Sequence, residues 1–119
     1  MYTTLCVPVQ LAVEHTSHLL QRQTKMETNN NEVMDILQEE AAEVIQAVSK
    51  IRRFGMDNGK HGTNQTNKEH LEEELGDMLA MIDILMINNV VSWSSLHAAK
   101  RAKIEKLKKW SNIPNLENI

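Results

Sequence analysis

The residues that break helices are confined to the ends of this chain and to one short internal segment. The two prolines, Pro8 and Pro114, lie near the termini, and three of the four glycines fall between residues 55 and 67. Proline in a helix interior removes a hydrogen bond and clashes with the preceding turn, so its absence elsewhere leaves long uninterrupted stretches. No stretch alternates β-branched and polar residues in the way a strand does. The sequence therefore predicts an all-α fold with one internal loop.

The spacing of apolar residues in the rest of the chain predicts four helices, arranged on a four-helix plan. Gly55 stands where a helix C-terminus needs a residue with positive φ, and Asn67 is a suitable N-cap for the helix after the loop. Ser92 or Ser94 is expected to cap the last helix, and the polar stretch 28–31 is expected to separate the first two. The predicted ranges are about Val9 to Gln23, Glu32 to Phe54, Lys68 to Asn89 and Ser94 to Trp110.

Length and composition exclude several classes of protein. A chain of 119 residues predicts a single domain spanning 1–119. A net charge of -3 with only 3% aromatic residues argues against proteins that bind nucleic acid or anionic membranes through bulk charge or base stacking. The single cysteine, Cys6, excludes an internal disulfide, and neither a secretory signal nor a membrane-spanning run is visible. A cytoplasmic protein is expected.

The predicted helix 32–54 carries carboxylates on its apolar face. On a helical wheel at about 100° per residue, Glu40 falls in the middle of the stripe that Val33, Leu37, Val44, Ala47, Val48 and Ile51 form. Glu43 lies at the edge of this stripe, whereas Glu39 points outward. A solvated acidic face explains most glutamate-rich helices and is accepted for Glu39. It does not suit Glu40.

The predicted helix 68–89 repeats the anomaly. Glu74 and Asp77 fall on the face that is otherwise lined by leucine, isoleucine and methionine, while Glu72 and Glu73 point elsewhere. Two pairs of buried carboxylates at i, i+3 spacing would repel each other, and each buried charge costs several kcal/mol. Protonation removes the cost, and so does a divalent cation. Four carboxylates with open positions suit hard Mg²⁺, with Mn²⁺ as a substitute.

The last predicted helix carries the opposite charge on its apolar face. Lys100 and Lys103 lie among Leu96, Ala99, Ile104, Leu107 and Trp110 on the wheel, whereas Arg101 points outward. Lysines directed toward an acidic metal cluster suggest a phosphate chain that bridges the two. Snorkelling of lysine stems along an apolar surface is the competing explanation. Lys50, beside Glu43 on its own wheel, is a further candidate for phosphate contact, with a plain surface role as the alternative.

The segments Glu39-Glu40-Ala-Ala-Glu43 and Glu74-Leu-Gly-Asp77 resemble the signature of the MazG-like all-α nucleotide pyrophosphohydrolases, E-E-x-x-E followed by E-x-x-D on two packed helices. The resemblance implies Mg²⁺ bound by Glu40, Glu43, Glu74 and Asp77. It also implies hydrolysis of a (deoxy)nucleoside triphosphate between the α and β phosphates, and a helical bundle completed by assembly into a homodimer or homotetramer.

Several alternatives stay open at this point. The proton acceptor for the attacking water could be Glu40, Glu43 or, from further away, Glu39. The substrate could be a non-nucleotide phosphoanhydride or phosphoribosyl-ATP, whose pyrophosphatases share the fold. A different class altogether is a helical interaction module that presents its carboxylates to a partner. Metal binding distinguishes this last alternative from the enzymes.

Overall fold

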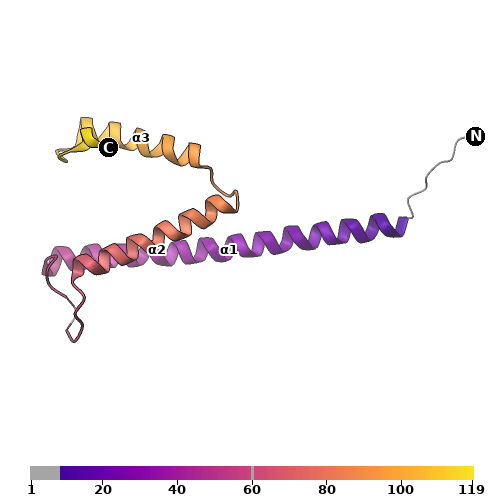
Figure 1. The fold of residues 1–119 in the computed structure, drawn as a ribbon, viewed down its shortest axis with the longest axis horizontal. Helices are drawn as coiled ribbons and strands as arrows, with labels where there is room; N and C mark the ends of the chain where they lie inside the picture. Colours follow the sequence, from indigo (N-terminus) through magenta and orange to yellow (C-terminus); the bar gives the residue numbers. More distant parts are fainter. Residues whose placement is uncertain (1–8, 60) are drawn as a thin grey trace, which may run out of the picture.

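The computed structural model describes residues 9–59 and 61–119, so the expectations for Cys6 and Pro8 lie outside it. Within this part the chain forms helices α1 (Val9–Phe54), α2 (Asn67–Ile87) and α3 (Trp93–Trp110), followed by a short 3₁₀ helix, η1 (Leu116–Asn118) (Figure 1). No strand forms among the described residues. The all-α prediction is confirmed.

The predicted break between the first two helices is wrong, because α1 runs unbroken through residues 24–31. Threonine hydroxyls there bond back to the helix instead of capping it: Thr24 donates to the carbonyl of Leu20 at 2.9 Å and Thr28 to that of Thr24 at 2.9 Å. Asparagine and threonine disfavour helix by only about 0.7 kcal/mol each, and no glycine or proline adds to that cost. Three helices therefore replace the predicted four.

The turn after α1 and the start of α2 are locked together. Gly55 ends α1 with φ of 88°, as predicted. Gly59 is required by close approach, since a Cβ there would lie 2.1 Å from the carbonyl oxygen of Gln65. Asn67 is not the N-cap but the first residue of α2, and its buried side chain donates to the carbonyl of Gly55 at 2.9 Å.

Thr66 is the N-cap of α2, in place of the predicted Asn67. Its hydroxyl accepts from the backbone N–H of Glu69 at 3.1 Å, while the Glu69 carboxylate accepts from the Thr66 N–H at 2.9 Å. This reciprocal pair is a capping box, which satisfies two otherwise free donors. At α3 the cap is Ser92, one of the two predicted serines.

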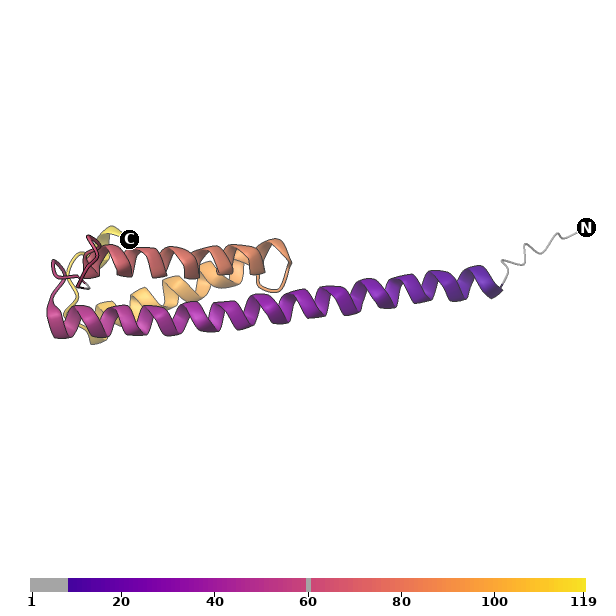
Figure 2. The same cartoon turned by 90° about the horizontal axis from the view of Figure 1, so that it is seen from below.

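The described helices form two layers. α1 and α2 lie antiparallel and in extensive contact, and Ala47 and Leu85 are buried (Figures 1 and 2). α3 forms a second layer and makes its main contacts with η1, where Leu116 is buried. The predicted four-helix bundle is therefore not what one chain forms: it forms a helix pair with α3 set apart.

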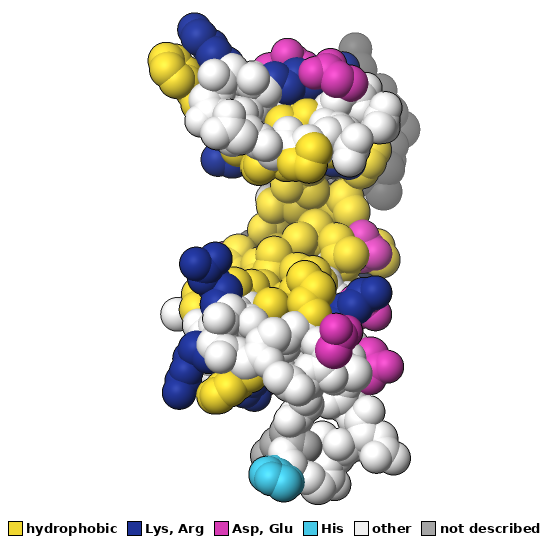
Figure 3. All heavy atoms as spheres, turned by 90° about the vertical axis from the view of Figure 1, so that its left-hand side faces the viewer, with side chains coloured by type: hydrophobic (Ala, Val, Ile, Leu, Met, Phe, Trp, Pro, Cys, Tyr) yellow, Lys and Arg dark blue, Asp and Glu magenta, His cyan; other side chains and the backbone are white. Residues whose placement is uncertain are grey.

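The molecule is far more extended than a self-contained domain. Its radius of gyration is 23.6 Å, whereas a compact chain of this length has about 13.5 Å. Large apolar side chains on every helix are exposed, among them Leu79 (61%), Ile87 (77%) and Trp110 (78%). Hydrophobic side chains also gather between the α3 part and the α1–α2 part (Figure 3). One chain thus leaves much apolar surface uncovered. None of its described helices is both long and apolar enough to cross a membrane.

Candidate metal centre

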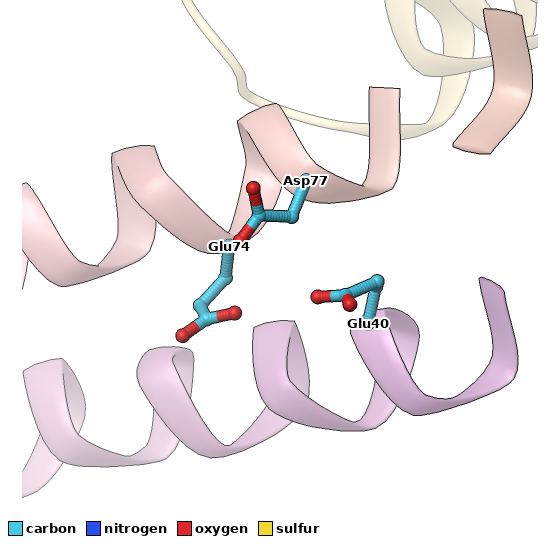
Figure 4. A group of neighbouring side chains, drawn as sticks. All are labelled: Glu40, Glu74 and Asp77. Carbon is cyan, nitrogen blue, oxygen red and sulfur yellow. The ribbon is translucent and has the colours of Figure 1, made fainter. Parts of the chain in front are cut away.

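Three carboxylates meet where α1 and α2 pack together. Glu40 reaches from α1 toward Glu74 and Asp77, which lie one turn apart on α2 (Figure 4). Each offers an oxygen within 4.8 Å of those of the other two. The i, i+3 spacing on α2 gives two ligands from one helix face, and the antiparallel pairing brings the third opposite them.

Burial differs among the four predicted ligands. Glu74 is buried, with 6% of its surface exposed, and Glu40 is half-buried. Asp77 and Glu43 are exposed, so the prediction that all four turn into the core is wrong for these two. Both therefore lie at the solvent-exposed edge of the α1–α2 contact. The centre therefore has one buried and one open side.

The local environment favours the protonated form of two of these carboxyls. Burial raises the pKa of Glu74 to about 7, with further contributions from a hydrogen bond to Glu43 and from the charges of Glu43, Asp77 and Glu40. The pKa of Glu40 is raised as well, first by desolvation and then by the charges of Glu43, Asp77 and Glu39. Both shifts thus combine loss of water around the carboxyl with the repulsion of neighbouring carboxylates.

The donor set fits a hard divalent cation. Oε2 of Glu74 is buried and forms no hydrogen bond within the described part of the chain. Such an atom normally finds a partner, because an unsatisfied buried acceptor costs about 1–3 kcal/mol. Oxygen-only ligands with an open side match the preference of Mg²⁺, which keeps several waters and binds few protein carboxylates. The arrangement could therefore hold a metal ion.

Glu43 and Glu39 lie close to the centre without joining the group of three. Glu43 stands one turn after Glu40 on α1, and its charge acts on both Glu40 and Glu74. Glu39 is exposed, as predicted, and its charge reaches Glu40 alone of the two. The assignment of ligand and base roles among these residues stays a prediction.

The candidate lysines lie on two different helices. Lys100 and Lys103 are exposed on α3, so the expectation that they lie in a buried face is wrong. The main contacts of α3 within one chain are with η1. Lys50 is half-buried on α1. It lines a cavity of about 580 Å³ together with Phe54, Asn67, His70 and four residues of the loop.

His70 is the neighbour that sequence reasoning missed. Its Nδ1 lies 3.1 Å from Oε1 of Glu74, one turn further along α2. The i, i+4 spacing His70-x-x-x-Glu74 was readable from the sequence, because residues four apart share a helix face. This spacing indicates a functional contact only once Glu74 is known to be buried.

Comparison with known proteins gives one match. The family model described as MazG nucleotide pyrophosphohydrolase domain matches residues 28–109, about two thirds of the chain. The matched segment contains Glu40, Glu74, Asp77 and all of α2, and it starts inside α1. No curated protein and no solved structure matched the chain.

Proposed function

The chain belongs to the MazG nucleotide pyrophosphohydrolase domain family, and we propose that it hydrolyses (deoxy)nucleoside triphosphates between the α and β phosphates, releasing the monophosphate and pyrophosphate. One observation carries the proposal: two paired helices bring the carboxylates of Glu40, Glu74 and Asp77 within 4.8 Å of one another. A cytoplasmic location is proposed with it, since the single cysteine favours a reducing compartment.

The proposed cofactor is Mg²⁺, with Mn²⁺ as a substitute. Glu40, Glu74 and Asp77 would hold it, with Glu43 as the fourth ligand. When bound, the cation supplies charge neutralisation for the phosphate oxygens and lowers the pKa of a water. The raised pKa of Glu74 and its unpartnered Oε2 support this proposal, because a cation would compensate both.

A carboxylate of α1, either one of the ligands or their neighbour Glu39, would take the proton of the attacking water. Water attacks the α phosphorus in line with the bond to the bridging oxygen, that bond breaks, and pyrophosphate leaves with the electron pair. Glu40, Glu43 and the exposed Glu39 are the candidate acceptors, all on one turn of α1. Glu39 has the advantage that it stands outside the ligand group and keeps both oxygens free of metal.

Phosphate binding is assigned to lysines from two parts of the molecule. Lys50 lies two turns after Glu43 on α1 and is half-buried, so it is placed to meet a phosphate on the same helix face. Lys100 and Lys103 reach the acidic centre only if an α3, from this chain or a second copy, closes over the α1–α2 pair. The role of these two lysines therefore depends on assembly.

The active form is proposed to be a homodimer or homotetramer. The extended shape and the exposed Leu79, Ile87 and Trp110 support this, because monomeric soluble proteins rarely expose large contiguous apolar surfaces. Assembly would also cover the open side of the acidic centre beside Asp77. Light scattering at micromolar concentration tests the proposal, and a mass of only 13.6 kDa would contradict it.

The activity is tested by incubating the protein with each common NTP and dNTP in Mg²⁺ and separating the products. Monophosphate with pyrophosphate is expected, and diphosphate with phosphate would contradict the proposed bond. Glu74→Gln should be inactive. Glu72→Gln is the matched control, because Glu72 lies on the same helix and is exposed. Turnover of phosphoribosyl-ATP or of a non-nucleotide anhydride instead would keep the chemistry and change the substrate.

No turnover, combined with no thermal shift in Mg²⁺, would favour a helical interaction module over an enzyme. In that case the carboxylates of Glu40, Glu74 and Asp77 would serve a partner surface. Turnover and the thermal shift together separate the alternatives, because the thermal shift reports metal binding whichever substrate is used.

A further inference from the structure

His70 and Glu74 form a contact that the proposed chemistry does not yet use. His70 Nδ1 lies 3.1 Å from Glu74 Oε1, and the side chains are 26% and 8% exposed. The two atoms are close enough for an N–H···O bond, and both His70 Nδ1 and Glu74 Oε2 are buried without a hydrogen-bond partner in the described chain. With its hydrogen on Nδ1, the imidazole can donate to Glu74 Oε1.

The position of His70 suits support of a ligand better than ligation. His70 lies outside the group formed by Glu40, Glu74 and Asp77, each of which offers one oxygen within 4.8 Å of those of the other two. Its ring instead lines the neighbouring cavity with Lys50 and Phe54. The imidazole therefore lines the cavity and also lies beside the Glu74 carboxylate, with Nδ1 close to Oε1.

We propose that His70 is a positioning residue that donates from Nδ1 to Glu74 Oε1 and thereby leaves Oε2 to the divalent cation. The inference rests on the proposed function, in which Glu74 is a ligand. Carboxylates and histidines that ligate metals are typically held by a hydrogen bond from behind, and loss of that partner weakens metal affinity by about 10–100-fold. His70 is the residue whose side chain contacts Glu74 from its own helix.

The same helix contains a matched control. Lys68 and Glu72 have the same i, i+4 spacing, with Lys68 Nζ 3.8 Å from Glu72 Oε1, but both side chains are more than 60% exposed. This pair lies on α2, only two residues from His70 and Glu74, and away from the acidic centre. Lys68→Ala thus removes a cation–carboxylate contact of equal spacing without touching the proposed ligands.

The experiment is a calorimetric titration of Mg²⁺ into the full chain and into His70→Ala, His70→Asn and Lys68→Ala at one fixed pH. We expect His70→Ala to raise the Kd for Mg²⁺ by about 10–100-fold. Asparagine presents an N–H close to the place of Nδ1, so His70→Asn should recover most of the affinity. Lys68→Ala should bind as the unchanged protein does. In turnover assays, saturating Mg²⁺ should restore much of the kcat of His70→Ala.

Several results would overturn the inference. Unchanged Mg²⁺ affinity in His70→Ala would do so and leave the proposed function standing. Equal losses in the alanine and asparagine variants, with both folded by circular dichroism, would assign His70 a packing role. If His70→Ala does not fold, the folded asparagine variant decides, and a loss there as large as 10-fold contradicts the donor role. A native protein that binds no Mg²⁺ would remove this inference together with the proposed function.

Discussion

The two halves of α1 have the same secondary structure and opposite surroundings. Residues 9–31 are exposed along almost their whole length, including Val9 (79%) and Leu20 (58%). Residues 32–54 pack against α2, and this half holds the buried Ala47 and the half-buried Glu40. Within one chain, the first half of α1 thus lacks the neighbouring helix that forms the acidic centre on the second half.

The family match follows the same division. It starts at residue 28, four residues before the paired half of α1 begins, and leaves out most of the unpaired half. A carboxylate on the unpaired half, such as Glu14, is surrounded by solvent. On the paired half, a carboxylate loses water and acquires like-charged neighbours from α2. The same residue type thus becomes a candidate ligand only where a second helix covers it.

The largest expected effect on activity comes from replacing Glu74, the carboxylate that is buried where α1 and α2 pack together. Glu74→Gln should lower kcat/KM by roughly 1,000-fold or more, because a lost metal ligand removes several kcal/mol of transition-state stabilisation. The metal-free variant should be as stable as the native protein or more stable at pH 8, since a buried carboxylate is removed. Steady-state kinetics and thermal unfolding measure the two effects. Near-native turnover would refute the role of Glu74.

A smaller loss of activity is expected from a substitution on α3, whose main contacts within one chain are with η1. Lys103→Ala should lower kcat/KM for triphosphates by about 10–150-fold, equivalent to ~1.5–3 kcal/mol for a charge-assisted bond. The Mg²⁺ affinity of the free protein should stay the same. Arg101→Ala is the control, because Arg101 is exposed on the opposite side of α3.

Lys108→Ala would be a less specific control than Arg101→Ala. The Nζ of Lys108 lies 3.0 Å from Glu105 and 3.9 Å from Glu117 of η1, so its removal also deletes contacts with these two carboxylates. Equal losses in Lys103→Ala and Arg101→Ala would mean that α3 contributes only general positive charge.

Replacing one alanine by leucine in each half of α1 compares the two halves directly. Ala47 is 1% exposed at the α1–α2 contact, and Ala47→Leu should destabilise the protein by about 1–3 kcal/mol through overpacking. Ala12 lies on the exposed half, where Ala12→Leu should change the free energy of unfolding by less than about 0.5 kcal/mol. Urea unfolding gives both values. A large effect at Ala12 would place the first half of α1 in a packed interface.

A pH trend in stability is expected in the metal-free protein. The pKa of Glu74 is raised to about 7 from an unfolded value near 4.5. Between these values the folded state binds more protons than the unfolded state, so stability should fall as pH rises through this window. Thermal unfolding in EDTA at pH 5 and pH 8 measures the trend. Glu74→Gln should reduce it, and an identical slope in the variant would contradict the shifted pKa.

The helical class, the loop and the acidic group could be predicted because each depends on local pattern. Gly55 marks the end of α1, and the wheel positions of Glu40 and Glu74 interrupt apolar stripes. The continuity of α1 could not be predicted in this way. Polar residues 28–31 look like a linker by type, and only the back-bonded hydroxyls of Thr24 and Thr28 show how a helix accommodates them.

Features that depend on tertiary arrangement were also missed. The apolar wheel face of α3 predicts buried lysines, but a wheel cannot tell whether a partner helix is present, and Lys103 is exposed. Asn67 is a residue type that favours the N-cap position, yet its side-chain amide instead donates a hydrogen bond to the carbonyl of Gly55 and holds the loop there. His70 gains meaning only from the burial of the carboxylate beside it.

The most direct test of the central claim is a crystal structure grown with Mn²⁺, which has an anomalous X-ray signal. A metal site on these helices predicts an anomalous peak between α1 and α2, coordinated by Glu40, Glu74 and Asp77, and no peak there in Glu74→Gln crystals. A peak at other residues, or an empty acidic centre at millimolar Mn²⁺, would contradict the assignment of these three carboxylates as a metal site.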